Sequence, residues 1–212
     1  MKTETAKDSS KVYLYESLFG KDYWKATWLN VSLCFAYECT GASLLKTFSN
    51  EIFENSSFDT HSVTMLIGAI NLFGSLLSMY TIKNFGRVQL LVWGFFGMAI
   101  SNFLMGLFLS LKNDILTIAT IVVSFLVFTT TVGPIQAIYA TETCVDSALG
   151  FVTMSIYLFR SAVGYFIPAL MLPSSKGGIG QSNVEYLIAS LMLLAAIFSY
   201  FLIKETKGLP DK

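Results

Sequence analysis

The stretch ATWLNVSLCFAYECTGASLLKTFSN, residues Ala26 to Asn50, is long and apolar enough to cross a bilayer, yet it contains Glu38 and Lys46. A helix needs about 20 apolar residues to span the hydrocarbon region, and charged side chains inside such a helix are costly. Lys46 follows Glu38 by eight residues, or about 12 Å along a helix, so its long side chain can reach the interface. Glu38 therefore needs another explanation.

Five further segments share this apolar character. The chain has 212 residues, of which 54% are hydrophobic and 13% are charged, a composition typical of membrane proteins. We predict an all-α membrane protein with an N-terminal arm and short amphipathic helix over residues 1–25, a bundle over 26–203 and a tail over 204–212. The six expected transmembrane helices are Ala26–Asn50, Val63–Ile82, Leu90–Leu111, Ile115–Tyr139, Ala148–Leu172 and Tyr186–Ile203.

The distribution of basic residues predicts the orientation. With six spans both termini lie on one side, and ten of the 14 Lys and Arg residues fall on that side. Only Lys112 and Lys176 fall on the other, while Lys46 and Arg160 lie within spans. Because basic loops stay inside, we expect both termini on the cytoplasmic or matrix-like side. Asn55-Ser56-Ser57 is a glycosylation sequon on the opposite side.

Several function classes find no support in the sequence. The single His and the three Cys residues follow no metal-ligand spacing, and neither a hydrolytic triad nor a phosphate-binding glycine loop is present. We therefore expect no enzymatic activity, no metal and no cofactor. The net charge is zero, so we expect the lipid bilayer rather than nucleic acid as a partner.

Gly133-Pro134 interrupts the fourth expected span. Pro134 has no N–H, so the carbonyl of Thr130 loses its helical partner and the helix can kink. The hydroxyls of Thr129, Thr130 and Thr131 can compensate freed backbone groups.

Five motifs in register resemble the C-terminal six-helix half of a sugar porter of the major facilitator superfamily. The stretch ending in Glu38-Cys39-Thr40-Gly41 is similar to the seventh helix of that family, and Gly68-Ala69-Ile70-Asn71 is similar to the start of the eighth. The other three motifs are Lys83-Asn84-Phe85-Gly86-Arg87, Gly133-Pro134-Ile135 with Glu142, and Lys204-Glu205-Thr206-Lys207-Gly208-Leu209. The resemblance implies half of a major facilitator fold.

The resemblance also implies a central substrate cavity, but its sugar-binding residues are largely replaced. The family's two seventh-helix glutamines and the following Asn correspond to Tyr37, Glu38 and Ser43. Losing neutral amides leaves sugar hydroxyls unpaired, so we expect sugar binding to be weakened. The cavity candidates are Tyr37, Glu38, Ser43, Asn71, Thr129, Gln136 and Arg160, of which only Asn71 keeps the family's sugar-contacting residue type.

A second cluster is implied at the end of the helices where the termini lie. The resemblance implies that Arg87, Glu142 and Glu205 approach one another there and hold the half together. Ordinary interfacial charge is the alternative, since exposed ion pairs contribute little.

Glu38 and Arg160 each lie about twelve residues from the start of a span, and both spans start on the same side. We therefore predict a Glu38–Arg160 ion pair, either direct or bridged by water. In one interpretation this pair closes the former sugar site. In the other, Arg160 binds an anionic substrate group and Glu38 couples transport to protons.

One six-helix half cannot alternate access alone, because major facilitators bind substrate between two halves. We expect the chain to pair with itself, with a separate N-terminal half or with other membrane subunits. An accessory subunit of a membrane complex is the favoured role, and a transporting half is the alternative.

Overall fold

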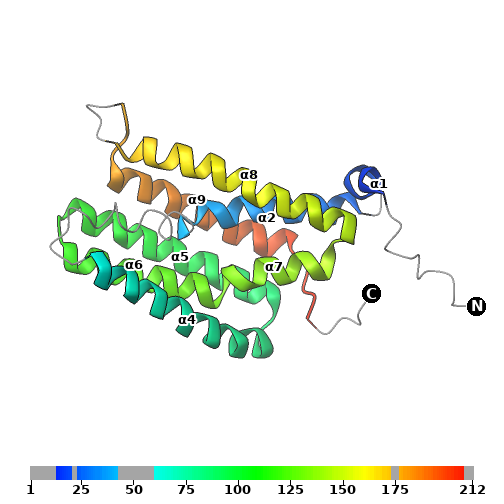
Figure 1. The fold of residues 1–212 in the computed structure, drawn as a ribbon, viewed down its shortest axis with the longest axis horizontal. Helices are drawn as coiled ribbons and strands as arrows, with labels where there is room; N and C mark the ends of the chain where they lie inside the picture. Colours follow the sequence, from blue (N-terminus) through cyan, green and yellow to red (C-terminus); the bar gives the residue numbers. More distant parts are fainter. Residues whose placement is uncertain (1–12, 21–22, 43–59, 173–176, 208–212) are drawn as a thin grey trace, which may run out of the picture.

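The computed structural model describes residues 13–20, 23–42, 60–172 and 177–207, and every regular element within these ranges is a helix (Figure 1). The first two are α1 (Leu14–Phe19) and α2 (Trp24–Cys39). The others are α4 (Thr60–Asn84), α5 (Arg87–Ser110), α6 (Asp114–Thr130), α7 (Val132–Thr143), α8 (Asp146–Met171) and α9 (Gln181–Leu202). Ser43, Lys46 and the Asn55 sequon lie outside the described residues.

The long helices run roughly parallel to one another and form an elongated bundle (Figure 1). Only a few residues join α4 to α5, α5 to α6 and α7 to α8, so these neighbours run in opposite directions. Helix α1, the start of α2 and the last turn of α9 lie at the same end of the bundle, which we call the α1 end (Figure 1).

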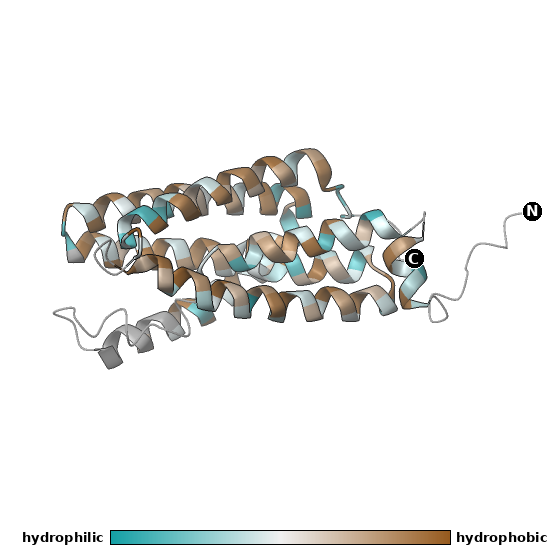
Figure 2. Cartoon of the chain, turned by 90° about the horizontal axis from the view of Figure 1, so that it is seen from above, coloured by the Kyte–Doolittle hydropathy of each residue, from teal (hydrophilic) through white to brown (hydrophobic). Residues whose placement is uncertain are grey.

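Hydrophobic residues occupy the outer faces of the helices as well as the core (Figure 2). A helix that is apolar all round belongs in a membrane or in a large core. Among the described residues, four stretches are long and apolar enough to cross a membrane: Arg87–Ser110, Ile115–Thr143, Asp146–Met171 and Gln181–Leu202. The prediction of six spans is thus confirmed for four of them and stays a prediction for the other two.

Helices α5 and α9 form the most extensive contact in the bundle. Their core includes Leu91, Phe95, Met98 and Met192, all of which are almost completely buried. Gly106 brings the two backbones close together, because a Cβ atom there would lie 3.1 Å from the carbonyl oxygen of Ser182. Small residues have this role in membrane helices, where packing replaces the hydrophobic effect as the driving force.

The fourth expected span consists of two helices separated by one residue, Thr131, with φ −124° and ψ −84°. The break lies one turn before Pro134, next to the carbonyl of Thr130 that Pro134 deprives of its helical donor. The hydroxyl of Thr81 on α4 donates to that carbonyl at 3.1 Å. The freed backbone group is therefore satisfied by a neighbouring helix.

Candidate functional site

Glu38 and Arg160 are in direct contact between α2 and α8. The guanidinium Nη2 of Arg160 lies 2.9 Å from Glu38 Oε1, and Nε donates to both carboxylate oxygens at 3.2 and 3.4 Å. The Glu38 side chain is completely buried, whereas the Arg160 side chain is 46% exposed and lies 5.7 Å from the Tyr157 ring centroid. The pair is therefore asymmetric, since the buried Glu38 carboxylate has Arg160 as its only paired cation among the residues that the structure describes.

The register of the two helices produces this contact. Glu38 is fourteen residues after Trp24, the first residue of α2, and Arg160 is fourteen after Asp146, the first of α8. Both helices start at the α1 end, so the two side chains lie at equal depth, about 21 Å along each axis. Helix α2 ends one residue later, and Gly41 follows with φ +74°, a conformation that favours glycine.

Among the described cavity candidates, Tyr37 lies close enough to this pair to interact with it electrostatically, and the others make separate contacts. Tyr37 packs on Phe128 with ring centroids 5.3 Å apart, and Gln136 donates to Cys34 Sγ at 3.2 Å between α7 and α2. Thr129 is buried against Gly74 at the contact between α6 and α4, and its hydroxyl donates to backbone carbonyls of its own helix. Asn71 is half-buried on α4.

A second polar cluster occupies the α1 end, where Arg87 at the start of α5 pairs with Glu142 on α7. Arg87 Nη2 lies 2.7 Å from Glu142 Oε1, and Nε donates to both carboxylate oxygens. The hydroxyl of Thr206, in the segment after α9, also donates to Glu142. This cluster joins three parts of the chain that are distant in sequence.

Glu205 contacts the same region but does not pair with the Arg87 side chain. Its carboxylate accepts from the backbone N–H groups of Arg87 at 2.8 Å and Val88 at 3.2 Å, the first two residues of α5. An acidic group at this position satisfies orphan donors and interacts favourably with the helix dipole. Gly86 makes room for it, since a Cβ atom there would overlap the Glu205 carboxylate. Glu205 is a helix cap contributed by a distant segment.

Glu205→Ala is expected to lower the free energy of unfolding by about 1 kcal/mol, because the first turn of α5 loses its cap. Denaturant titration of the purified protein in mild detergent measures this difference. Lys207→Ala, in the same segment, is the control, because that side chain is exposed. Equal stabilities of the two variants would contradict the capping role.

Glu185 is a buried acid that the sequence analysis missed. It lies in the second turn of α9, is 3% exposed, and forms no ion pair with any cation among the described residues. On helix α5, which packs against α9, the buried amide nitrogen of Asn102 finds no hydrogen-bond partner within the described part of the chain. The predicted span Tyr186–Ile203 starts one residue after Glu185 and so does not include it. Its signal was the helical spacing it shares with Ile188, Ala189 and Met192.

No group of three His, Cys, Asp or Glu side chains suited to a metal ion occurs in the described part of the chain.

The fold defines the class of the protein. The chain superposes on the proton:xylose symporter XylE bound to 6-bromo-6-deoxy-D-glucose with a TM-score of 0.81, at 21% identity over 93% of this chain and 43% of that chain. The inward open xylose transporter XylE from E. coli gives a TM-score of 0.77, at 21% identity over 92% and 42%. The chain is an integral membrane protein with the major facilitator fold.

The family follows from the sequence match. Residues 1–211 match the model of the family described as Sugar (and other) transporter, and the chain belongs to that family. It is 24% identical to the probable plastidic glucose transporter 3 of Arabidopsis thaliana, over 98% of this chain and 43% of that protein. It is 26% identical to the probable metabolite transport protein CsbC of Bacillus subtilis, over 87% and 43%. The chain thus spans about two fifths of the length of these relatives.

Proposed function

We propose that this chain forms a six-helix half of a sugar-porter-like assembly and acts there as a non-transporting membrane component. The observation that carries the proposal is the Glu38–Arg160 contact. The buried carboxylate at the family's sugar-binding position is fully engaged by a guanidinium of the same chain, at 2.9 Å. A pair that satisfies itself needs no ligand, and a carboxylate does not reproduce the donor and acceptor pattern of an amide.

The exposed face of α8 supports a partner in the membrane. Only 11% of the most apolar 18-residue stretch of α8 is buried within the structure. Four large side chains on this helix are each more than half exposed: Tyr157, Leu158, Tyr165 and Phe166. Large apolar side chains in a membrane can face lipid, but Arg160 shares this helix and its charge is costly in hydrocarbon. A second six-helix unit or another membrane subunit would cover both. We propose this partner, together with the orientation that places both termini on the cytoplasmic or matrix-like side.

The exposure of Arg160 favours a second candidate function. Almost half of its side chain remains accessible, so the guanidinium can contact an anionic group in addition to Glu38. In this case the chain is the substrate-binding half of a transporter for a small organic anion, with Glu38 as the proton-coupled group. Neither function includes an enzymatic step.

Ligand-dependent thermal stability separates the two functions. The protein, purified with whatever membrane partner remains bound, is heated in the presence of hexoses, pentoses and small carboxylates at saturating concentration. The proposed component shows no shift of the melting temperature with any of them. A shift with carboxylates that disappears in Arg160→Gln, but remains in the distant control Lys112→Gln, would establish the transporting half instead. A shift with sugars in both variants would contradict both functions.

A further inference from the structure

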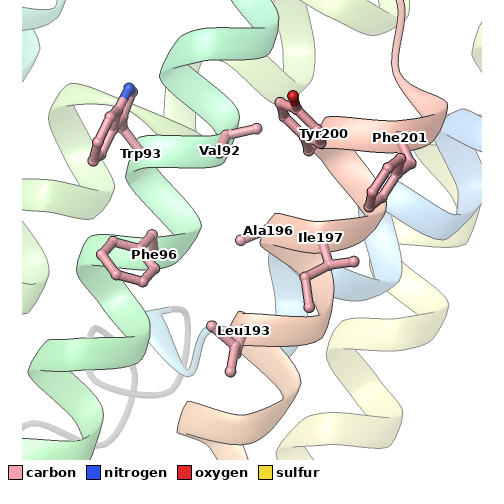
Figure 3. A pocket seen from close by; sticks show the side chains of 8 residues that line it. All are labelled: Val92, Trp93, Phe96, Leu193, Ala196, Ile197, Tyr200 and Phe201. Atoms are coloured by element: carbon pink, nitrogen blue, oxygen red, sulfur yellow. The ribbon is translucent and has the colours of Figure 1, made fainter.

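An apolar groove of about 380 Å³ lies on the outer face of the contact between α5 and α9 (Figure 3). Helix α5 contributes Val92, Trp93 and Phe96, and α9 contributes side chains between Leu193 and Phe201. Ala196 forms the floor, where its small side chain leaves space between the helices (Figure 3). The groove is far from Glu38 in the sequence and takes no part in the proposed function.

The groove faces outward, and its walls are exposed. Trp93 is 69% exposed and Tyr200 is 67% exposed, although both helices are apolar enough to cross a membrane. In a bilayer, this face contacts either lipid or another membrane protein. Exposed apolar surface of this kind marks an interaction site when polar groups border it.

Among the eight described residues that line the groove, the side-chain polar atoms lie at one end. The indole nitrogen of Trp93 and the hydroxyl oxygen of Tyr200 both lie at the end of the groove nearest the C-terminus of α9 (Figure 3). This is the α1 end of the bundle (Figure 1). Trp and Tyr adopt this arrangement at the membrane surface, where the ring is in hydrocarbon and the polar atom meets the headgroups.

Lys204 supplies a positive charge at this end of the bundle. Lys204 is exposed two residues after α9 and makes no ion pair among the described residues. Glu142 pairs with Arg87, and the carboxylate of Glu205 is turned toward α5, where it accepts from the first two N–H groups of that helix. A lysine near the membrane surface that makes no ion pair with the described residues can attract an anionic headgroup.

We propose that this groove is a binding site for an anionic phospholipid of the leaflet at the α1 end. One acyl chain lies over Ala196 between α5 and α9, and the headgroup phosphate lies at the polar end. There it can accept from Trp93 Nε1 and the Tyr200 hydroxyl and pair with Lys204. The apolar lining supplies the affinity for the chain, and the lysine supplies the preference for a negative headgroup.

Quenching of Trp93 by brominated lipids tests the site. The Trp24→Phe/Trp28→Phe variant leaves Trp93 as the only tryptophan, and is reconstituted, with any partner that co-purifies, in phosphatidylcholine bilayers. Brominated phosphatidylglycerol is expected to reach half-maximal quenching at a mole fraction about fivefold lower than brominated phosphatidylcholine, the preference that one interfacial lysine confers. Lys204→Gln should make the two lipids equivalent, while Lys112→Gln, at the opposite end, should leave the preference intact.

Filling the groove provides the second arm. Ala196→Phe should reduce quenching by both lipids to that of a tryptophan on an ordinary lipid-facing helix. Equal quenching by the two lipids in the single-tryptophan variant would show ordinary boundary lipid and would overturn the proposal. Absence of quenching by either lipid would show that a protein partner covers the groove, which overturns it as well. Since Lys204 is exposed, its variant keeps the test decisive if Ala196→Phe does not fold.

Discussion

Arg160→Met is expected to lower the free energy of unfolding by about 3 kcal/mol, because it leaves the completely buried Glu38 carboxylate without a cation. The reverse change should cost less. In Glu38→Gln the guanidinium keeps an amide acceptor and no buried carboxylate is left unpaired, so we expect a loss of about 1 kcal/mol. Denaturant titrations of the purified protein in mild detergent measure both differences.

The double variant Glu38→Met/Arg160→Met is the control for this asymmetry. Removing both charges leaves neither one stranded, so its stability should return to within about 1 kcal/mol of the parent protein. Arg160→Lys keeps the charge but loses the two-point contact, and should fall between the parent and Arg160→Met. Equal losses in the two single variants, or a double variant that is no better than Arg160→Met, would contradict a coupled pair.

Gly94→Leu is expected to destabilise the bundle by about 3 kcal/mol, the upper part of the usual range for overpacking. Gly94 lets α5 approach the break between α6 and α7, since a Cβ atom there would lie 2.8 Å from Val132 Cγ2 and 2.9 Å from Thr131 Cβ. Thr131 connects α6 directly to α7, so its backbone cannot move away without displacing one of these helices. The same titration measures the loss.

Gly150→Leu is the matched control, because a Cβ atom on Gly150 in α8 meets nothing within 4 Å. Leu is a better helix former than Gly, so this variant should be at least as stable as the parent protein. A similar loss in both variants would show that the cost at Gly94 arises from something other than close helix packing.

The helices themselves were largely predictable from hydropathy. The spans Leu90–Leu111 and Ala148–Leu172 closely match α5 and α8, because long apolar segments have few alternatives to a membrane helix. The start of α9 was not predictable in this way. The helix begins at Gln181, five residues before the apolar segment, and so includes the buried Glu185.

The candidate site was predictable in part. Residue counting placed Glu38 and Arg160 at the same depth, and the structure has them in contact. The role of Glu205 could not be predicted by residue counting. A carboxylate near Arg87 can pair with the Arg87 guanidinium or accept from the backbone N–H groups at the start of α5, and Glu205 does the latter. The path of the segment after α9 past the start of α5 decides between these two partners. The groove at Ala196 also depends on two helices whose facing residues are about 100 positions apart.

By itself, the sequence determined that this protein is a helical membrane protein of the sugar transporter family, and at what depth its buried charges lie. Composition and helical rise are properties of a single segment, so both can be evaluated from the sequence without knowing which helices pack against it. Only the tertiary structure decided which groups meet: Thr81 with the freed Thr130 carbonyl, Glu205 with the start of α5, and α5 with α9 around an open groove. These contacts depend on how each helix is rotated about its axis, and that rotation is set by packing between helices.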